Sequence, residues 1–219
     1  MHGMVGDDES PRGRPAGRAG QVAGLPAELA ARKADLRLRV LGARRRLGSP
    51  ERAAAGRRLR DAILDAPQTQ MAGAVAVYGS VGSEPDTLGL LFALWKRGAY
   101  VLLPVLRRDN DLDWASYEGP DSLVPGPHGL LEPAEPPRGV TAITSADLVI
   151  VPALAADRLG NRLGRGGGSY DRALARVGPA VPTIALLYDE ELVDSVPVGP
   201  HDQRVRAVAQ PAEGIIRLA

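Results

Sequence analysis

The sequence predicts an α/β protein whose sheet is mostly parallel and twisted, with helices on both of its faces. Five short, nearly continuous apolar runs follow one another along the chain, and helical patterns separate several of them. Such runs suit strands that are buried on both faces, as in a parallel sheet between layers of helices. The 219 residues suit one domain, or one domain with a tail, and the hydrophobic fraction of 44% can fill a single core. We therefore expect a single Rossmann-like domain.

The N-terminal residues 1–24 are rich in Gly, Pro, Arg and acidic side chains and hold almost no large apolar ones. Such a segment cannot bury enough apolar surface to order itself, so we expect a disordered extension ahead of a domain over residues 25–219. A nucleic-acid-binding arm is the less favoured alternative, because the acidic residues at 7–9 offset the arginines at 12, 14 and 18.

Two helices are expected at the start of the domain. The first spans residues 26–47, with Pro26 near its first position. The second helix follows, with Ser49 as its expected N-cap and Pro50 as its first helical residue. Apolar residues recur in it at helical spacing, which predicts a buried face made by Leu59, Ile63 and Leu64.

Strands and helices alternate after this pair of helices. The expected strands are 74–78, 100–105, 147–152, 182–188 and 205–209. The expected helices between them are 86–97, 170–177 and 190–195. Residues 118–139 fit neither kind of element, because they hold six prolines and few apolar side chains. Two interpretations of this segment stay open, a lid or binding loop and a meandering surface crossing.

The composition excludes several classes of site. The sequence has no cysteine, which removes disulfides, thiolate zinc sites and cysteine nucleophiles, and its three histidines show no ligand spacing. The formal net charge of +1 argues for neither nucleic acid nor a membrane as a partner. No apolar run is long enough to span a bilayer, and the N-terminus lacks the apolar stretch of a signal peptide. We expect a cytoplasmic protein.

A glycine-rich stretch, "NRLGRGGGSYDRAL" at residues 161–174, leads into one of the expected helices. The backbone N–H groups of such a loop and the positive end of the helix dipole can bind phosphate, with Ser169 as the expected N-cap. Asp171 adds a carboxylate where Mg²⁺ usually bridges a polyphosphate. Guanidinium groups that match phosphate oxygens flank the glycines, at Arg162, Arg165 and Arg172.

Neither familiar glycine motif is present in this stretch. A P-loop needs a lysine, and a dinucleotide fingerprint read from Gly164 needs a glycine in place of Ser169. Spacing alone therefore leaves two interpretations open, a phosphate-binding loop and a tight glycine turn whose arginines are solvated.

The full string "RLGRGGGSYDR", preceded by "VPALAADRLGN", resembles the signature of the 5-formyltetrahydrofolate cyclo-ligase family, also called methenyltetrahydrofolate synthetase. That signature has a Pro-Ala/Gly-Leu-Ala segment followed by Arg-Leu-Gly-x-Gly-x-Gly-Tyr-Tyr-Asp-Arg. Five further segments fall in the family's order: "KADLR" at 33–37, "YGSVGSEPDT" at 78–87, "LPVLRRDNDLDWASY" at 103–117, "GLLEP" at 129–133 and "HDQRV" at 201–205. The resemblance covers residues 27–211.

The resemblance implies an enzyme that uses ATP and Mg²⁺ to cyclise 5-formyltetrahydrofolate to 5,10-methenyltetrahydrofolate, with release of ADP and phosphate. In that chemistry the formyl oxygen is phosphorylated, N10 of the folate attacks the formyl carbon, and phosphate leaves as the ring closes. Positioning and electrostatic stabilisation carry such a reaction without a protein nucleophile. The implied partners are 5-formyltetrahydrofolate and ATP, and the chain is expected to be a monomer or a weak homodimer.

The resemblance also implies the roles of individual residues. Those implied to bind ATP are Lys33, Arg37, Arg162, Leu163, Gly164, Arg165, Gly166, Gly167, Gly168, Ser169 and Tyr170. Those implied to bind the folate are Gly79, Glu84, Trp114, Tyr117, Arg165, Gly168 and Ser169. Asp171 and Asp202 are implied to hold Mg²⁺. The residues implied to serve catalysis are Arg162, Arg165 and Tyr170.

Some of these roles have ordinary structural alternatives. Without the resemblance, Lys33 and Arg37 read as a solvated helix face, and Asp202 as a turn residue. A core position is the alternative for Trp114. Ser169 departs from the family, which has the first of two tyrosines there, and this leaves less stacking surface for the folate. The competing hypotheses are a relative that binds folate or nucleotide without turnover, and a sugar-phosphate isomerase on a similar sheet.

Overall fold

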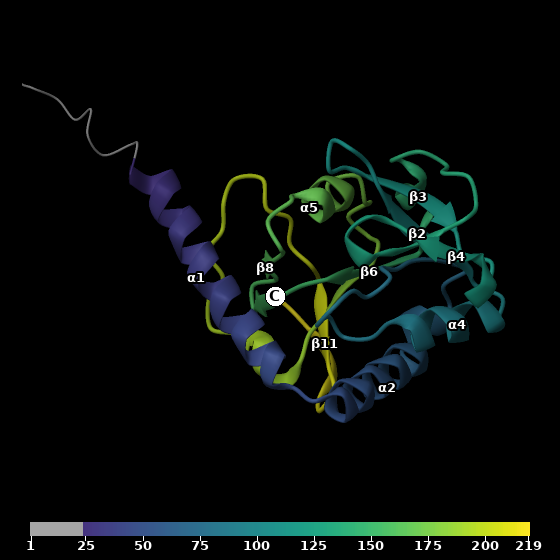
Figure 1. Ribbon diagram of the computed structural model, residues 1–219, viewed down its shortest axis with the longest axis horizontal. Helices are drawn as coiled ribbons and strands as arrows, with labels where there is room; N and C mark the ends of the chain where they lie inside the picture. Colours follow the sequence, from purple (N-terminus) through teal and green to yellow (C-terminus); the bar gives the residue numbers. More distant parts are fainter. Residues whose placement is uncertain (1–23) are drawn as a thin grey trace, which may run out of the picture.

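The computed structural model describes residues 24–219 of the chain (Figure 1). The extension expected over residues 1–24 lies outside the described residues, except for Gly24. Seven strands form the main sheet, in the order β12-β11-β9-β6-β1-β2-β3. Their bounds are Ala74–Ala76 (β1), Tyr100–Leu106 (β2), Leu112–Ser116 (β3), Leu148–Pro152 (β6), Thr183–Leu186 (β9), Ala207–Gln210 (β11) and Gly214–Arg217 (β12).

The five central strands of this sheet are parallel, and these are the five that the apolar runs predict. The edge strands β3 and β12, which the sequence did not predict, pair antiparallel with β2 and β11. Numbered along the chain, the parallel strands lie in the order 2-1-3-4-5, which is the flavodoxin-like order of doubly wound sheets. The mostly parallel α/β fold is therefore confirmed, whereas the narrower Rossmann-like description is not. The strand order reverses between β1 and β6, which creates a crevice at their carboxyl ends.

Helices cover both faces of the main sheet. The helices α2 (Ser49–Asp65) and α4 (Leu88–Lys96) lie on one face, and α5 (Ser169–Leu174) lies on the other with the 3₁₀ turn at Ala142–Ser145 (Figure 1). Successive residues of a strand point to opposite faces, so Leu148 and Ile150 of β6 pack into one core cluster and Val149 into the other. Two buried clusters on the two faces hold the sheet between them.

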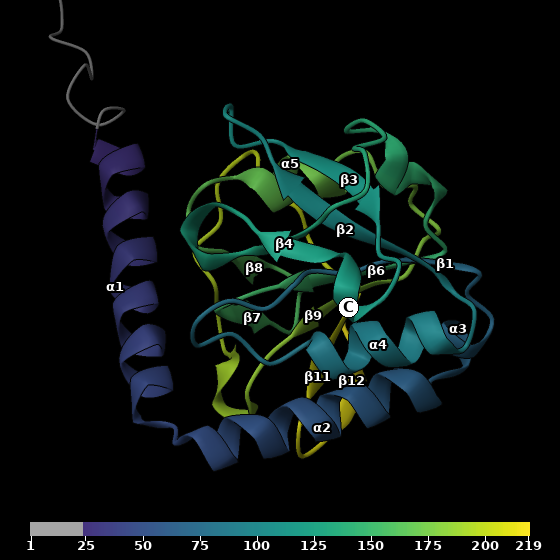
Figure 2. The ribbon, with the colours of Figure 1, turned by 45° about the vertical axis from the view of Figure 1, so that its right-hand side comes forward.

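The helix α1 (Gly24–Arg46) stands beside the body of the molecule rather than on a face of the main sheet (Figure 2). Its buried Leu36 and Val40 form a small apolar cluster with Leu154 and Leu163. Through this cluster the helix packs against a small second sheet, to which Leu163 belongs. None of the helices in residues 24–219 is long and apolar enough to cross a bilayer. The strands of the second sheet lie in the order β10 (Leu192–Val193), β7 (Ala155–Asp157) and β8 (Arg162–Leu163).

The proline-rich segment 118–139 forms a short antiparallel hairpin of β4 (Leu123–Pro125) and β5 (Leu131–Pro133). Two 3₁₀ turns, at Pro120–Ser122 and Pro127–Gly129, complete it. Glu132 ties the hairpin to the sheet, because its carboxylate accepts a hydrogen bond from the backbone N–H of Leu106, at 2.9 Å.

The prediction of a helix over residues 190–195 is wrong. A single 3₁₀ turn at Asp189–Glu191 leads directly into β10, which pairs with β7. The reason is the side chain of Glu191, which points inward and accepts hydrogen bonds from the backbone N–H of Tyr188 and from Arg44. The apolar Leu192 and Val193 then extend the small sheet instead of continuing a helix.

The N-cap expected at Ser49 is also wrong, because α2 begins at Ser49 and Gly48 is its N-cap. Glu51 reaches back to accept a hydrogen bond from the backbone N–H of Gly48, at 2.7 Å. This half of a capping box satisfies a backbone donor that the helix leaves free, and Pro50 takes the second helical position. The short helix α3 (Pro67–Gln70) then leads into β1.

Candidate functional site

A cavity of about 680 Å³ opens at the point where the strand order of the main sheet reverses. Pro104 and Leu106 of β2 line it, and so do the segments that follow β1 and β6 at Tyr78 and Ala153. The helix α1, the hairpin of β4 and β5, and the glycine-rich stretch close its other sides. Ligands of doubly wound proteins bind at this place, outside the carboxyl ends of the strands.

The glycine-rich loop runs from β8 to α5 along one wall of this cavity. Gly166 and Gly168 have positive φ angles of 111° and 69°, which other residues adopt only with strain. Gly168 is the N-cap of α5, so the N-cap role expected for Ser169 is wrong. The helix α5 has only six residues, so its dipole is weak, and the positive charge of the cavity comes mainly from side chains.

Four positively charged side chains line the cavity. The helix α1 contributes two of them, Lys33 and Arg37, which lie one turn apart on the cavity side of the helix. Arg37 donates a hydrogen bond from Nε to the carbonyl of Gly164, at 2.9 Å, so it lies against the start of the glycine-rich loop. Lys33 Nζ lies 2.5 Å from Oδ2 of Asp202. Burial raises the pKa of the Asp202 carboxyl, but the hydrogen bonds from Lys33 and from the backbone N–H of Gly199, together with the positive charges of Lys33 and Arg162, outweigh this, and the net pKa is below its ordinary value.

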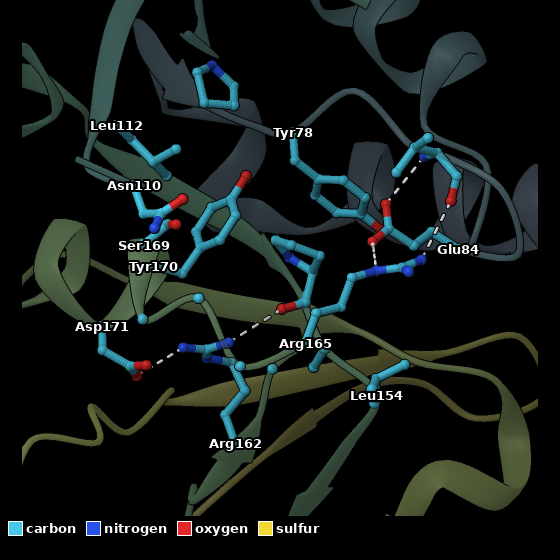
Figure 3. A pocket seen from close by; sticks show the side chains of 18 of the residues that line it. Tyr78, Glu84, Asn110, Leu112, Leu154, Arg162, Arg165, Ser169, Tyr170 and Asp171 are labelled. Carbon is cyan, nitrogen blue, oxygen red and sulfur yellow. Dashed lines mark hydrogen bonds and ion pairs between the residues drawn. The ribbon is translucent and has the colours of Figure 1, made fainter. Parts of the chain in front are cut away.

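A third cation, Arg162, is buried beside α5 in β8. Its Nη2 donates to Oδ1 of Asp171 at 2.8 Å, and its Nη1 to the carbonyl of Pro152 at 3.4 Å (Figure 3). Oδ1 of Asp171 also accepts the backbone N–H of Gln203, at 3.1 Å. These contacts join the end of β6, the start of α5 and the segment that carries Asp202.

The fourth cation, Arg165, reaches across the cavity to Glu84, and Figure 3 shows the contact. The Nε···Oε1 distance is 2.9 Å, and the other carboxylate oxygen of Glu84 accepts the backbone N–H of Val81 at 3.0 Å. The side chain of Glu84 is only 7% exposed, whereas that of Arg165 is 49% exposed. The carboxylate is therefore fixed at the cavity wall, while the guanidinium is free to take another partner.

The space between these charged groups is lined by aromatic and aliphatic side chains. Tyr170 lies in the middle of the view in Figure 3, between Asn110 on one side and Tyr78 on the other. Burial raises the pKa of both tyrosines well above the ordinary value, so both hydroxyl groups keep their protons. The aliphatic part of the lining consists of Val81, Pro104, Leu106, Leu112, Leu130, Leu131, Pro152, Ala153, Leu154 and Leu163.

The cavity brings together nearly all of the residues that the sequence singled out. Of the expected ATP-binding and metal-binding residues, every one lines it, from Lys33 to Asp202. The expected folate-binding residues Gly79 and Glu84 also line it. The hairpin in 118–139 contributes Leu130 and Leu131, which favours the binding-loop interpretation of that segment.

Two expected folate-binding residues lie elsewhere. Trp114 is 1% exposed and belongs to one buried cluster of the main sheet, and Tyr117 belongs to the other. Neither lines the cavity, so the expectation of a pocket position is corrected in favour of the core. Arg172, one of the arginines expected to match phosphate oxygens, does not line the cavity either, and its guanidinium donates to the carbonyls of Asn110 and Gly167.

The sequence did not indicate Asn110 as a cavity residue. It lies in the turn between β2 and β3 and has a φ of 62°, the one positive value of a non-glycine residue in the described part of the chain. Asparagine tolerates this conformation better than most residues, which makes "RDND" a turn signal that could have been read. Its place in the cavity wall depends on the tertiary fold.

The cavity offers carboxylate oxygens to a divalent cation that is also bound by the phosphates of a ligand. No group of three metal-ligating side chains forms among residues 24–219. The hydrogen bonds to Asp171 and Asp202 fall on Oδ1 and Oδ2 respectively, so each carboxylate keeps its other oxygen for a further ligand. Mg²⁺ typically takes one or two carboxylates together with substrate phosphates and water, and these two residues fit that pattern.

Comparisons with known proteins agree with this architecture. The model of the 5-formyltetrahydrofolate cyclo-ligase family matches residues 29–211. The chain is 44% identical to the 5-formyltetrahydrofolate cyclo-ligase of Mycolicibacterium smegmatis over 149 residues, which is 66% of this chain and 76% of that protein. It is 33% identical to the Escherichia coli enzyme of the same name over 174 residues, which is 78% of this chain and 96% of that protein.

Solved structures give the same answer. The NMR structure of Aquifex aeolicus 5,10-methenyltetrahydrofolate synthetase has a TM-score of 0.74 and 26% identity, over 85% of this chain and 92% of that one. The Mycoplasma pneumoniae synthetase, at 18% identity and a TM-score of 0.64, supports the fold over 80% of this chain and 96% of that one. From the match over residues 29–211 and these relatives, it follows that the chain belongs to the 5-formyltetrahydrofolate cyclo-ligase family.

Proposed function

We propose that this protein converts 5-formyltetrahydrofolate to 5,10-methenyltetrahydrofolate at the expense of ATP. One observation carries the proposal: a single cavity at the switch point of the sheet joins four cations to the buried carboxylate of Glu84. The cations suit a polyphosphate, and a carboxylate among apolar side chains suits the N–H-rich edge of a pterin. The two substrates would then meet in one enclosed space.

The reaction needs an activated formyl group, because the oxygen of an amide is a poor leaving group. In the proposed course the formyl oxygen attacks the γ-phosphorus of ATP, and the bond to the bridging oxygen breaks to release ADP. N10 of the folate then attacks the formyl carbon and loses its proton. The carbon–oxygen bond breaks, and inorganic phosphate leaves as the ring closes. The protein binds and orients the reactants, and no side chain becomes covalently attached.

The phosphate side of the cavity is the part near α1 and β8. Lys33, Arg37 and Arg162 are each held by an acceptor within the protein, so their charges are already oriented before ATP arrives. Asp171 and Asp202 would hold Mg²⁺ there through their free oxygens. When bound, Mg²⁺ would neutralise part of the phosphate charge. The glycines let the backbone approach the phosphates without the obstruction of side chains.

The folate side of the cavity is the part near Glu84. The two carboxylate oxygens of Glu84 suit the amino and ring N–H groups of a pterin, which would replace Arg165 as the partner of Oε1. Arg165 would then turn towards the transferring phosphoryl group, since it is half-exposed and long enough to change its contacts. The hydroxyl group of Tyr170 keeps its proton and can donate to an oxygen of either substrate, but it cannot act as a base.

The proposal is tested with the full chain, 5-formyltetrahydrofolate and ATP, by following the near-ultraviolet absorbance of methenyltetrahydrofolate. Absorbance should rise only when ATP and Mg²⁺ are both present, and one ADP should form per molecule of product. Binding of 5-formyltetrahydrofolate without any product would instead support the relative that binds without turnover.

Replacing Ser169 by tyrosine is expected to lower KM for 5-formyltetrahydrofolate by roughly 2- to 10-fold and to leave kcat within about twofold. Ser169 lines the cavity next to Tyr170, where a ring adds stacking surface in the ground state and the transition state alike. Because Gly168 rather than Ser169 caps α5, the melting temperature should not fall. Ser169→Ala is the matched control, and an unchanged KM in a folded Ser169→Tyr variant would contradict a folate contact there.

A further inference from the structure

We infer that Arg44 and Glu191 are positioning residues, which fix α1 so that Lys33 and Arg37 reach the phosphates of ATP. The inference rests on the proposed function, because it assumes that these two cations bind ATP. Neither Arg44 nor Glu191 lines the cavity, so their effect must pass through the helix.

Arg44 and Glu191 form a buried, bidentate ion pair at the C-terminal end of α1, which we call the foot of the helix. Arg44 is 1% exposed, and its Nε and Nη2 each lie 2.7 Å from one carboxylate oxygen of Glu191. Nη2 also donates to the carbonyl of Ala153, at 2.7 Å. Two parallel hydrogen bonds fix the rotation and the height of the guanidinium, which a single contact would not.

The pair contacts the backbone of a residue that lines the cavity. Ala153, which accepts from Arg44, lines the cavity directly after β6. The guanidinium also lies over the ring of Tyr188, 5.3 Å from its centroid. The hydroxyl of Tyr188 donates to the backbone carbonyl of Glu84, at 3.3 Å. The foot of α1 is thus linked to the walls on which both proposed substrates would lie.

The geometry of α1 carries the effect from this pair to the cavity. Arg44 follows Lys33 by eleven residues and Arg37 by seven, so all three lie on the same side of the helix. Between them, the small cluster around Leu36 and Val40 is the apolar contact of this side. Both ribbon views show α1 standing beside the body of the molecule, with its foot at the junction to α2 (Figures 1 and 2). Apart from the hydrogen bonds of Lys33 and Arg37 themselves, so small an apolar area leaves the orientation of α1 to the buried pair at its foot.

Stability alone does not explain a buried ion pair at this place. Taking both charges out of water costs about as much as their attraction returns, and an apolar pair of similar volume often stabilises a protein equally well. What an apolar pair lacks is direction, since it cannot fix the helix relative to the carbonyl of Ala153. The contribution specific to Arg44 and Glu191 is therefore the position of α1.

The experiment compares the parent chain with the double variant Arg44→Met/Glu191→Leu, which leaves no unpaired charge in the core. We expect an unchanged or slightly higher melting temperature, a KM for ATP raised about tenfold, and kcat within about twofold. KM for 5-formyltetrahydrofolate should change less than KM for ATP. Hydrogen exchange should become faster in α1 and stay unchanged in the main sheet. The matched control is Arg39→Met/Asp35→Leu, which removes an exposed ion pair from the same helix and should alter neither constant.

A second comparison separates positioning from a general loss of structure. In a Lys33→Ala/Arg37→Ala background the Arg44→Met/Glu191→Leu change should raise KM for ATP by less than about twofold, because its effect passes through these two cations. An equal tenfold rise in both backgrounds, or an unchanged KM in the folded double variant, would overturn the inference. Glu191→Gln, which keeps the shape and one acceptor, is the second variant if the double one does not fold, and its KM for ATP should rise by a smaller factor. If the parent chain shows no ATP-dependent turnover, the proposed function fails, and the exchange of α1 still tests whether the pair anchors the helix.

Discussion

Asp171→Asn is expected to keep the fold and to lower kcat/KM for ATP-dependent cyclisation roughly 10²- to 10³-fold. Oδ1 of Asp171 accepts hydrogen bonds from Arg162 and from the backbone N–H of Gln203, and an amide oxygen can accept both. The amide cannot supply the negative charge, so it holds Mg²⁺ poorly and leaves Arg162 without its counter-charge. The loss should therefore appear in catalysis far more than in structure.

The measurement is the initial rate at saturating folate over a series of Mg²⁺ concentrations, together with the melting temperature of each variant. Asp111→Asn is the matched control, since Asp111 is also a partly buried carboxylate paired with an arginine, Arg176, at 2.6 Å, but does not line the cavity. That variant should lose stability while its kcat/KM stays within about threefold of the parent value. Normal turnover of Asp171→Asn at limiting Mg²⁺ would show that this carboxylate does not hold the metal.

The sequence predicted the strands of the central sheet because each is a short apolar run, and burial on both faces leaves that signature. The edge strands carry no such run, so β3 and β12 were missed: β3 is mostly buried but is interrupted by Asp113, and β12 is only partly buried. The strands β7, β8 and β10 have only two or three residues each, too few for any periodicity to be read. These short strands nevertheless bring α1 to the cavity, which is why its geometry required the structure.

In the candidate site, too, some residues could be predicted from the sequence and others required the structure. Glycines and arginines that are adjacent in the chain could be read as one loop, and the resemblance added Lys33, Glu84 and Asp202 from distant segments. Trp114 was misplaced because a strand that runs away from the cavity contributes only its first residues to the wall. Leu112 at the start of β3 lines the cavity, while Trp114, two residues further on, lies in the core. Depth along a strand is a property of the tertiary fold, and neither composition nor spacing reports it.

The second large effect is expected at Glu84, where replacement by glutamine should raise KM for 5-formyltetrahydrofolate roughly 10- to 100-fold. A hydrogen bond to a charged group contributes about 1.5–3 kcal/mol, and each 1.4 kcal/mol corresponds to a factor of ten in affinity. The carboxylate is 7% exposed, so little water is available to replace a lost partner. Glutamine has one acceptor oxygen in place of two, and its NH₂ group would face the N–H groups of the pterin.

The fold should tolerate this change. An amide oxygen can still accept the backbone N–H of Val81, which is the local contact of the carboxylate. The ion pair with Arg165 contributes little to stability, because the guanidinium is half-exposed and solvated. Glu132→Gln is the matched control, since Glu132 also accepts a backbone N–H, that of Leu106, but does not line the cavity. It should leave both Michaelis constants unchanged.

The pattern of constants decides what Glu84 does. A contact with the pterin exists in the ground state and the transition state alike, so its loss should raise KM for the folate, with kcat within about threefold and KM for ATP within about twofold. If Glu84 served mainly to hold Arg165 for the phosphoryl group, kcat would fall instead and KM for the folate would stay constant. If it served only the local turn, the melting temperature would fall and both constants would stay near the parent values. A rise in KM for the folate alone is therefore the result that assigns the carboxylate to the pterin.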